Sequence, residues 1–301
     1  MALAEEVLEG AIENIREGKL GDLDELSKAI RSANSQVSEK TYRGTTTTSK
    51  ARELVEIFNQ DMYERASTDD LIKGVRTGFD DLDVKINGMN PGNYIVIAGR
   101  PGMGKTTLAM NIAENVAKKD GNVLIFSQEM PKAQLMRRVV ASVATVEQQK
   151  IKEARFTQHE AAQIKSATNE IAEWNFIICD EGGLTLQSFE TTVIQEHEEN
   201  PLSCVILDYI QLMSTKGLPG NTRTEKIGEI SNSIKRLALN LGIPIIVLSQ
   251  LNRSLEERQD KRPINSDLRD AGAIEQDADI ILFTYRDEVY DPDSPDKGFA
   301  E

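Results

Sequence analysis

Short apolar runs alternate with amphipathic stretches along the chain from Thr77 onward. Runs of Val, Ile and Leu with the length of strands lie at residues 94–98, 123–127, 176–179, 204–207, 245–248 and 280–284. Between them, apolar residues recur at helical spacing at residues 105–118, 132–143, 158–174, 186–198 and 225–241. Near-continuous apolar strands separated by helices are typical of a parallel sheet with helices on both faces. The pattern therefore predicts an α/β domain over residues 68–301.

The first 67 residues follow a different pattern, which predicts a helical arm and a linker. Apolar residues at helical spacing indicate two amphipathic helices, around residues 3–15 and 23–30. Residues 32–49 are polar and include a run of threonines from Thr45 to Thr48, which indicates a flexible linker.

A third amphipathic helix is predicted at about residues 49–66, with Ser49 as its N-cap. Its apolar stripe contains Ala51, Leu54, Val55, Phe58 and Met62. A helix behind a linker needs a surface that covers such a stripe. Periodicity alone leaves two partners open, its own domain or a neighbouring subunit. We predict an intersubunit helix.

One loop after the first strand carries the strongest chemical signal. It fits the phosphate-binding pattern G-x-x-x-x-G-K-[ST] with Gly99, Arg100, Pro101, Gly102, Met103, Gly104, Lys105 and Thr106. Glycines let backbone N–H groups surround phosphate oxygens, and the following helix adds partial positive charge at its N-terminus. Lys105 is placed to reach the β- and γ-phosphates, and the Thr106 hydroxyl to coordinate Mg²⁺. We expect a bound nucleoside triphosphate, since a strand precedes the loop and a helix follows it.

Further polar residues follow other strands, where ligands of parallel sheets bind. Asp208 ends the run 204–207 and is suited to hold the water shell of Mg²⁺. Glu129 follows the run 123–127, where a carboxylate is placed to polarise an attacking water. Gln250 follows the run 245–248 and is a candidate sensor of the γ-phosphate. Each residue taken alone also fits a polar strand end that has no function.

Composition limits the classes of protein that fit. The 301 residues are 39% hydrophobic, enough for a sizeable core, and no apolar run approaches the ~18 residues of a membrane span. The N-terminus lacks the features of a signal peptide. Cys179 and Cys204 lie in apolar strand-like runs, which favours reduced, buried thiols. We expect a cytosolic protein without a membrane partner. The net charge of −14 excludes a generally basic surface but not a local nucleic-acid site.

Five ordered motifs give the chain from about Thr77 a resemblance to the RecA-like ATPase domain of DnaB-type replicative DNA helicases. The phosphate-binding loop is the first, and the stretch 267–279 is the most specific. The stretch 267–279 reads DLRDAGAIEQDAD. The other motifs are LIFSQEM at 124–130, LDYIQLM at 207–213 and SQLNRS at 249–254. The sequence DKRP at 260–263 follows the last of them.

The resemblance implies roles for individual residues. Lys105, Thr106 and Asp208 would bind ATP and Mg²⁺, with Glu129 as the catalytic base. The nucleotide would also be contacted by Thr107, Arg138 and Gln250. A loop containing Arg269, Asp270 and Gly272 would meet single-stranded DNA inside a ring, in which Asp270 would orient Arg269 or a backbone amide, since an acid repels phosphate.

The resemblance also implies partners and two departures. It implies that the chain assembles as a ring, which is a hexamer in the family. It also implies translocation from 5′ to 3′ on DNA, and a primase and a helicase loader as partners. Of the family's compact N-terminal domain, only the trailing edge and the linker would fit before Thr77. Its C-terminal strand with a Lys/Arg pair that acts on the neighbour's ATP would lie beyond Glu301, and such a finger is worth about 10³–10⁵ in rate. We therefore expect impaired turnover from these residues alone. Two alternatives stay open, a RecA-type recombinase that forms filaments and an assembly fragment that binds nucleotide without unwinding.

Overall fold

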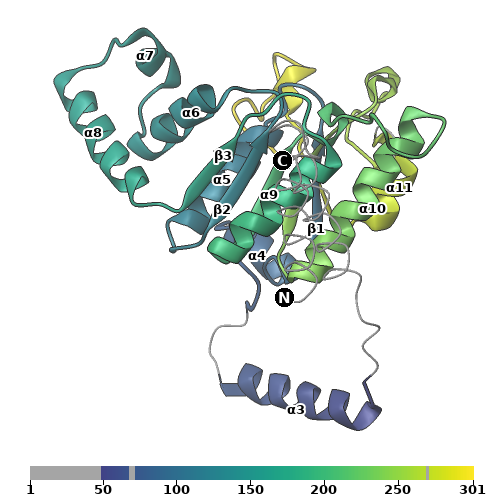
Figure 1. Cartoon of the computed structure of the whole chain (residues 1–301). Coiled ribbons are helices and arrows are strands. Elements are labelled where there is room, and N and C mark those ends of the chain that lie inside the picture. The colour runs from purple at the N-terminus through teal and green to yellow at the C-terminus, as the bar shows by residue number, and fades with distance from the viewer. Residues whose placement is uncertain (1–48, 68–71, 269–270) are drawn as a thin grey trace, which may run out of the picture. The chain divides into compact units, whose positions relative to one another are not determined.

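The computed structural model describes residues 49–67, 72–268 and 271–301 (Figure 1). The chain divides into two compact units, residues 1–69 and 70–301, each described here by itself. The predicted helices and linker before residue 49 lie outside the described residues.

The described part of the first unit is one helix, α3 (Ala51–Ser67). With Ser49 as the N-cap, the helix would begin at Lys50. It begins instead at Ala51, so that Lys50 is the residue that precedes its first turn. The backbone N–H of Lys50 donates to Glu53 Oε2 at 3.1 Å, which satisfies an amide at the helix start. The prediction of the helix is confirmed, and that of Ser49 as its N-cap is wrong.

The second unit is built on a six-stranded sheet in which all paired strands are parallel. The strands are β1 (Tyr94–Gly99), β2 (Val123–Ser127), β3 (Phe176–Cys179), β4 (Cys204–Asp208), β5 (Ile245–Gln250) and β6 (Ile280–Phe283). Their order across the sheet is β3-β2-β4-β5-β1-β6. The predicted α/β architecture with a parallel sheet is confirmed.

Helices cover both faces of this sheet, and alternate residues of a strand enter different cores. Tyr94, Val96 and Ala98 of β1 belong to the core under α9 (Leu186–Glu199), α10 (Arg223–Leu241) and α11 (Ala271–Asp277). Ile95 and Ile97 belong to the opposite core, under α5 (Lys105–Ala117) and α6 (Lys132–Ala144). Burial on both faces explains why the strands are apolar throughout rather than alternating.

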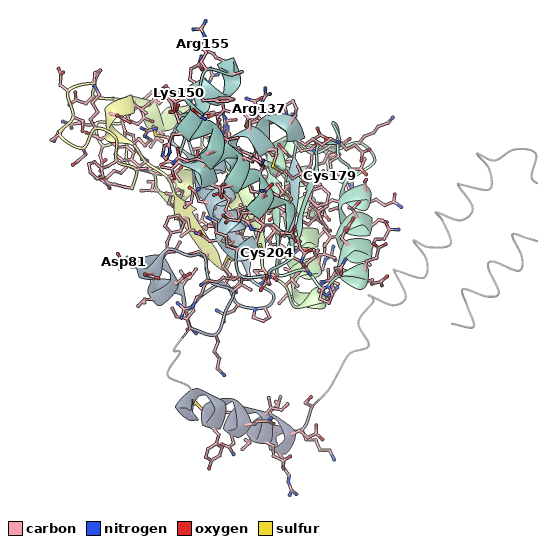
Figure 2. All side chains as sticks on the ribbon, turned by 90° about the vertical axis from the view of Figure 1, so that its left-hand side faces the viewer. Asp81, Arg137, Lys150, Arg155, Cys179 and Cys204 are labelled. Atoms are coloured by element: carbon pink, nitrogen blue, oxygen red, sulfur yellow. The ribbon has the colours of Figure 1, made fainter. Side chains whose placement is uncertain are left out.

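Between β2 and β3 the chain forms a helical lobe to one side of the sheet (Figure 1). It contains α6, α7 (Gln148–Glu153) and α8 (Gln158–Ala172). A small core joins them through Ala144, Val146 and Ala167. Figure 2 shows Arg137, Lys150 and Arg155 on this lobe.

Several short elements have no counterpart in the sequence prediction. They are α4 (Asp80–Ile86), α7, α11 and the 3-10 helices η1 (Ile210–Leu212), η2 (Arg253–Glu257), η3 (Asn265–Asp267) and η4 (Asp287–Val289). The helices α4 and α11 span seven residues each and α7 spans six, too few for an apolar repeat to emerge. None of the residues of α7 is buried.

The two cysteines are free thiols, as predicted, but the prediction that both are buried is wrong for Cys179, which is half-buried. Cys204 is fully buried, and burial raises the pKa of its thiol to about 12. Figure 2 places both cysteines in the region of the sheet. Within the described residues, no helix is long and apolar enough to cross a membrane. The same residues contain no group of three or more His, Cys, Asp or Glu side chains that could hold a metal ion.

Candidate nucleotide site

The glycine-rich loop joins the end of β1 to the start of α5. Gly102 and Gly104 have φ angles of 81° and 94°, in the left-handed region that side chains rarely adopt. A Cβ at either position would meet no atom within 4 Å, so the space beside the loop is open. Gly104 occupies the N-cap of α5 without a side-chain cap, which leaves the first amides of this helix for a ligand.

Lys105 lies inside this loop. Its Nζ donates to the carbonyl oxygens of Gly99 at 2.9 Å and Arg100 at 3.2 Å. Burial lowers the pKa of Lys105, an effect that the negative charges of Asp208 and Glu129 oppose. A cation held on backbone carbonyls can exchange them for phosphate oxygens without a large movement.

Thr106 and Asp208 join the loop to the end of β4. The Thr106 hydroxyl donates to Asp208 Oδ2 at 2.8 Å. Burial raises the pKa of Asp208 to about 6, and the negative charge of Glu129 adds to the rise, whereas the bond from Thr106 opposes it. Asp208 Oδ1 is buried and has no hydrogen-bond partner. A buried carboxylate oxygen without a partner, beside a hydroxyl, is the chemistry that a hard cation satisfies.

A cleft of about 510 Å³ opens above the loop. It collects most of the predicted nucleotide-site residues from four separate segments: Pro101, Gly102, Gly104, Lys105, Thr106, Thr107, Glu129, Arg138 and Gln250. The structure thus brings together side chains that lie up to 149 residues apart in the sequence, the separation of Pro101 from Gln250.

Three members of the loop do not line the cleft. Arg100 points away, and its Nε and Nη2 each lie 2.8 Å from Glu256 Oε1. The side chain of Met103 is buried, and its sulfur accepts a hydrogen bond from Arg286 N at 3.3 Å. Gly99 is closely packed, since an added Cβ would lie 2.3 Å from Thr284 Oγ1. These residues shape the loop from behind.

A tight turn after β2 presents Glu129 to the cleft. Ser127 Oγ donates to Met130 O at 2.7 Å and accepts from Met130 N at 3.3 Å, which closes the turn around Glu129. Gln128 is anchored on the far side, where its Nε2 donates to Glu181 O at 2.7 Å. Glu129 itself stays exposed.

Arg138 lies on α6, where its Nε is buried without a hydrogen-bond partner. Its charge lies close enough to Asp208 to lower the pKa of that carboxyl. A guanidinium with an unused donor at the wall of this cleft is suited to an anionic ligand.

Gln250 ends β5 beside the cleft and is held by a residue that the sequence analysis did not single out. The Gln250 N–H donates to Gln211 Oε1 at 3.3 Å, and Gln211 Nε2 donates to Ser249 Oγ at 2.9 Å. Gln211 is buried in the turn after β4. It therefore ties the ends of β4 and β5 together.

Four cleft-lining residues were missed by sequence reasoning. Met130 and Tyr209 directly follow Glu129 and Asp208, so their position after a strand was a usable signal. Gln148 lies on α7, which was not predicted, and Arg286 follows β6, where no motif marked it.

Of the predicted DNA-contacting residues, Arg269 and Asp270 lie outside the described residues. Gly272 is exposed in the first turn of α11, and a Cβ there would meet no atom within 4 Å. The surface at Gly272 is therefore open to a ligand.

The phosphate loop, the strand-end carboxylate paired with its threonine and the parallel sheet together define a P-loop ATPase fold. The chain matches the DnaB-like helicase C-terminal domain family over residues 74–301. It belongs to this family.

Similar proteins agree with this assignment. The chain is 50% identical over 234 residues to the replicative DNA helicase DnaB of Pasteurella multocida (strain Pm70), which covers 76% of this chain and 50% of that protein. It is 38% identical over 231 residues to DnaB of Geobacillus stearothermophilus, covering 76% and 51%. The chain thus spans about half the length of the curated relatives it matches.

Solved structures show the same fold. A structure described as an ATPase domain matches with a TM-score of 0.79 and 36% identity over 84% of this chain and 89% of that one. A DnaB-like replicative helicase, solved for its interactions with primase, matches with a TM-score of 0.84 and 34% identity over 99% of this chain and 68% of that one. The predicted RecA-like architecture is confirmed.

Proposed function

We propose that this chain is the ATP-hydrolysing motor of a replicative DNA helicase that moves 5′ to 3′ on single-stranded DNA as a ring. The convergence of Lys105, Thr106, Glu129 and Gln250 on one cleft, with Asp208 bonded to Thr106 behind it, carries the proposal. Membership of the helicase family, shown over residues 74–301, supplies its biological setting.

In this proposal the glycine loop holds the phosphates of ATP, and Lys105 exchanges its carbonyl partners for the β- and γ-phosphates. The Thr106 hydroxyl and the unpartnered Asp208 Oδ1 fit Mg²⁺, directly or through water. The bound ion would neutralise charge on the transferring phosphoryl group.

Glu129 is the proposed base, since its carboxylate is exposed to the cleft and its turn is fixed from both sides. In that role it orients the attacking water and accepts its proton. Arg138 and Gln250 are proposed contacts of the nucleotide, and the bond of Gln250 to Gln211 fixes the end of β5 behind it.

Arg269, Asp270 and Gly272 are the proposed contacts to single-stranded DNA. The open surface at Gly272 supports close approach of a sugar–phosphate backbone. Asp267, which precedes them, binds Arg258 through both carboxylate oxygens.

We further propose that residues 1–67 are an arm and linker, that residues 68–301 are the motor domain, and that primase and a helicase loader are partners of the assembled protein. A DnaB-like helicase of the same fold has been solved for its interactions with primase, which supports the first of these partners.

Electron microscopy with ATP and single-stranded DNA separates this function from its nearest rival. A ring motor gives closed particles, whereas a RecA-type recombinase gives helical filaments along the DNA. Filaments would overturn the helicase proposal and leave the nucleotide site intact.

The exposed stripe of α3 leads to a prediction about assembly. Leu54, Phe58 and Met62 are 53%, 60% and 46% exposed, and each would gain about 1.5–3 kcal/mol from burial. We expect Leu54→Asp with Phe58→Asp to convert rings to monomers while the ATPase domain stays folded, as measured by analytical ultracentrifugation and circular dichroism.

The control for this double variant adds the same charge outside the stripe, as Asn59→Asp with Gln60→Asp, and should keep the ring. If the stripe variant sediments like its parent, the helix packs on its own domain and the intersubunit role is wrong.

The positive charge of Arg269 is expected to decide the affinity for DNA. An acidic protein has no generally basic surface that could attract the DNA instead. Arg269→Ala should weaken binding to single strands of any sequence. It should also lower the slope of log affinity against log salt by about 0.7, the contribution of one phosphate contact. Filter binding at two salt concentrations measures both effects.

Arg155→Ala is the matched control, since the Arg155 side chain is 83% exposed on the helical lobe. It should bind DNA like the parent. Equal affinity and equal slope for the Arg269→Ala variant and the parent would remove Arg269 from the DNA site.

A further inference from the structure

The end of β5 and the segment before the proposed DNA contacts lie side by side. Leu251 directly follows Gln250, Leu268 directly precedes Arg269, and the two leucines form an antiparallel bridge. Both leucines are buried. The proposed nucleotide sensor and the proposed DNA contact, 19 residues apart in sequence, are therefore each one residue from the same bridge.

Asp267 extends this bridge by one residue. Its carbonyl oxygen accepts from Asn252 N at 2.8 Å, and its own N–H donates to Ile264 O at 2.9 Å. Its Oδ2 accepts from Ile264 N at 2.8 Å. The backbone around Asp267 is thus bound on one side to the end of β5 and on the other to the start of η3.

Arg258 holds the carboxylate of Asp267 in place with two parallel bonds. Arg258 Nη1 donates to Asp267 Oδ1 at 2.9 Å, and Nη2 lies 2.9 Å from Oδ2. The Asp267 side chain is only 7% exposed, so the pair is shielded from water on one side.

The remaining donors of Arg258 bind the loop that lies between Arg258 and Asp267. Nε donates to Asp260 O at 3.2 Å, and Nη2 also donates to Arg262 O at 2.7 Å. One guanidinium therefore binds the outgoing loop and the returning segment together. A lysine has one ammonium and cannot reproduce this set of bonds.

We propose that Arg258 is a positioning residue that couples the nucleotide site to the DNA site. By binding Asp267, it keeps the Leu251–Leu268 bridge closed. A structural change at Gln250 is then transmitted through this bridge to Arg269. The proposal rests on the proposed function and names the contact through which its two sites communicate. It requires the coupling between the sites, not their separate affinities, to depend on Arg258.

The test measures the affinity of labelled single-stranded DNA by fluorescence anisotropy, once with ATPγS and Mg²⁺ and once with ADP and Mg²⁺. The ratio of the two affinities reports the coupling, and about 5–150-fold is usual between linked sites. Because binding alone is measured, the result does not depend on the rate of turnover. Fluorescent-nucleotide binding without DNA gives the second readout.

For Arg258→Ala we expect a ratio close to one, with nucleotide affinity unchanged within about twofold. Asp267→Asn should do the same, and the double variant should not change the ratio further, since both changes break the same Arg258–Asp267 pair. Arg258→Lys should fail to restore the ratio. Arg253→Ala is the control: this arginine lies exposed in η2, and in the described part of the chain its side chain has no hydrogen bond or ion pair.

Loss of affinity in both nucleotide states by the same factor, with the ratio preserved, would show a merely structural role and overturn the proposal. A preserved ratio in a folded Asp267→Asn variant would do so even if Arg258→Ala did not fold. A parent protein that binds DNA equally in both states, or not at all, would instead refute the proposed function, and the coupling role with it.

Discussion

Replacing Lys105 with alanine is expected to abolish ATP hydrolysis, with a loss in kcat of at least about 10², the cost of removing one preorganised charge donor. The ammonium lies within the glycine loop on the carbonyls of Gly99 and Arg100, where we propose that it binds the phosphates of ATP. Nucleotide-dependent assembly should fail as well. Phosphate release and sedimentation with ATP measure the two effects.

Lys119→Ala is the matched control, because Lys119 is exposed just beyond the end of α5. The variant loses the same positive charge as Lys105→Ala, but outside the cleft. Its turnover should equal that of the parent. A purified Lys105→Ala protein with near-normal turnover would sink the assignment of the phosphate loop.

Glu129→Gln is expected to lower hydrolysis by about 10²–10⁴ while ATP still binds, because the amide keeps the size of the side chain and loses only its basicity. Asp208→Asn should weaken both Mg²⁺-dependent binding and rate, since it alters the buried group paired with Thr106. Single-turnover hydrolysis and equilibrium ATP binding separate the two variants.

Glu173→Gln makes the same chemical change at an exposed position at the end of α8 and serves as the control. It should leave binding and rate unchanged. If the Glu129 and Asp208 variants lose ATP affinity equally and neither retains bound ATP, the division of roles between the two carboxylates is wrong.

The sheet was predictable because its four inner strands are buried and its edge strands β3 and β6 are half-buried, so that all six read as continuous apolar runs. The runs at 123–127 and 176–179 match β2 and β3 in full. The run at 245–248 fell short of β5 (Ile245–Gln250), since Ser249 and Gln250 are polar although they pair with Ala98 and Gly99. Polar residues at a strand end continue the ladder without leaving an apolar signal.

The site was predictable where chemistry follows a strand, because parallel strands bring their carboxyl ends to one edge. That rule located Glu129 and Gln250 in the cleft of Lys105, and Asp208 beside it through its bond from Thr106. It gave no means of finding the other contributors, which depend on tertiary neighbours that no spacing in the sequence specifies. These are Arg286 just before η4, Gln148 of α7, and the contacts of Gln211 and Arg258.

The same limit explains why the proposed communication between the two sites could be argued only from the structure. Leu251 and Leu268 lie in separate motifs, and their bridge exists because the loop between them folds back through η2 and η3. The sequence motifs place the proposed sensor and the proposed DNA contact at the two ends of this loop, and the Arg258–Asp267 pair is the link that we propose between them.

Strand displacement tests the proposed helicase function most directly. A labelled strand is followed on forked duplexes that carry either a 5′ or a 3′ single-stranded tail for loading, with ATP and Mg²⁺, beside Glu129→Gln as the inactive control. The protein assayed is the chain joined to the C-terminal strand with the Lys/Arg pair, because impaired turnover is expected without that strand. The account predicts ATP-dependent release from the 5′-tailed fork, much less from the 3′-tailed fork and none with the control variant. Hydrolysis of ATP on single-stranded DNA without release from either fork would contradict it and favour a nucleotide-binding assembly module.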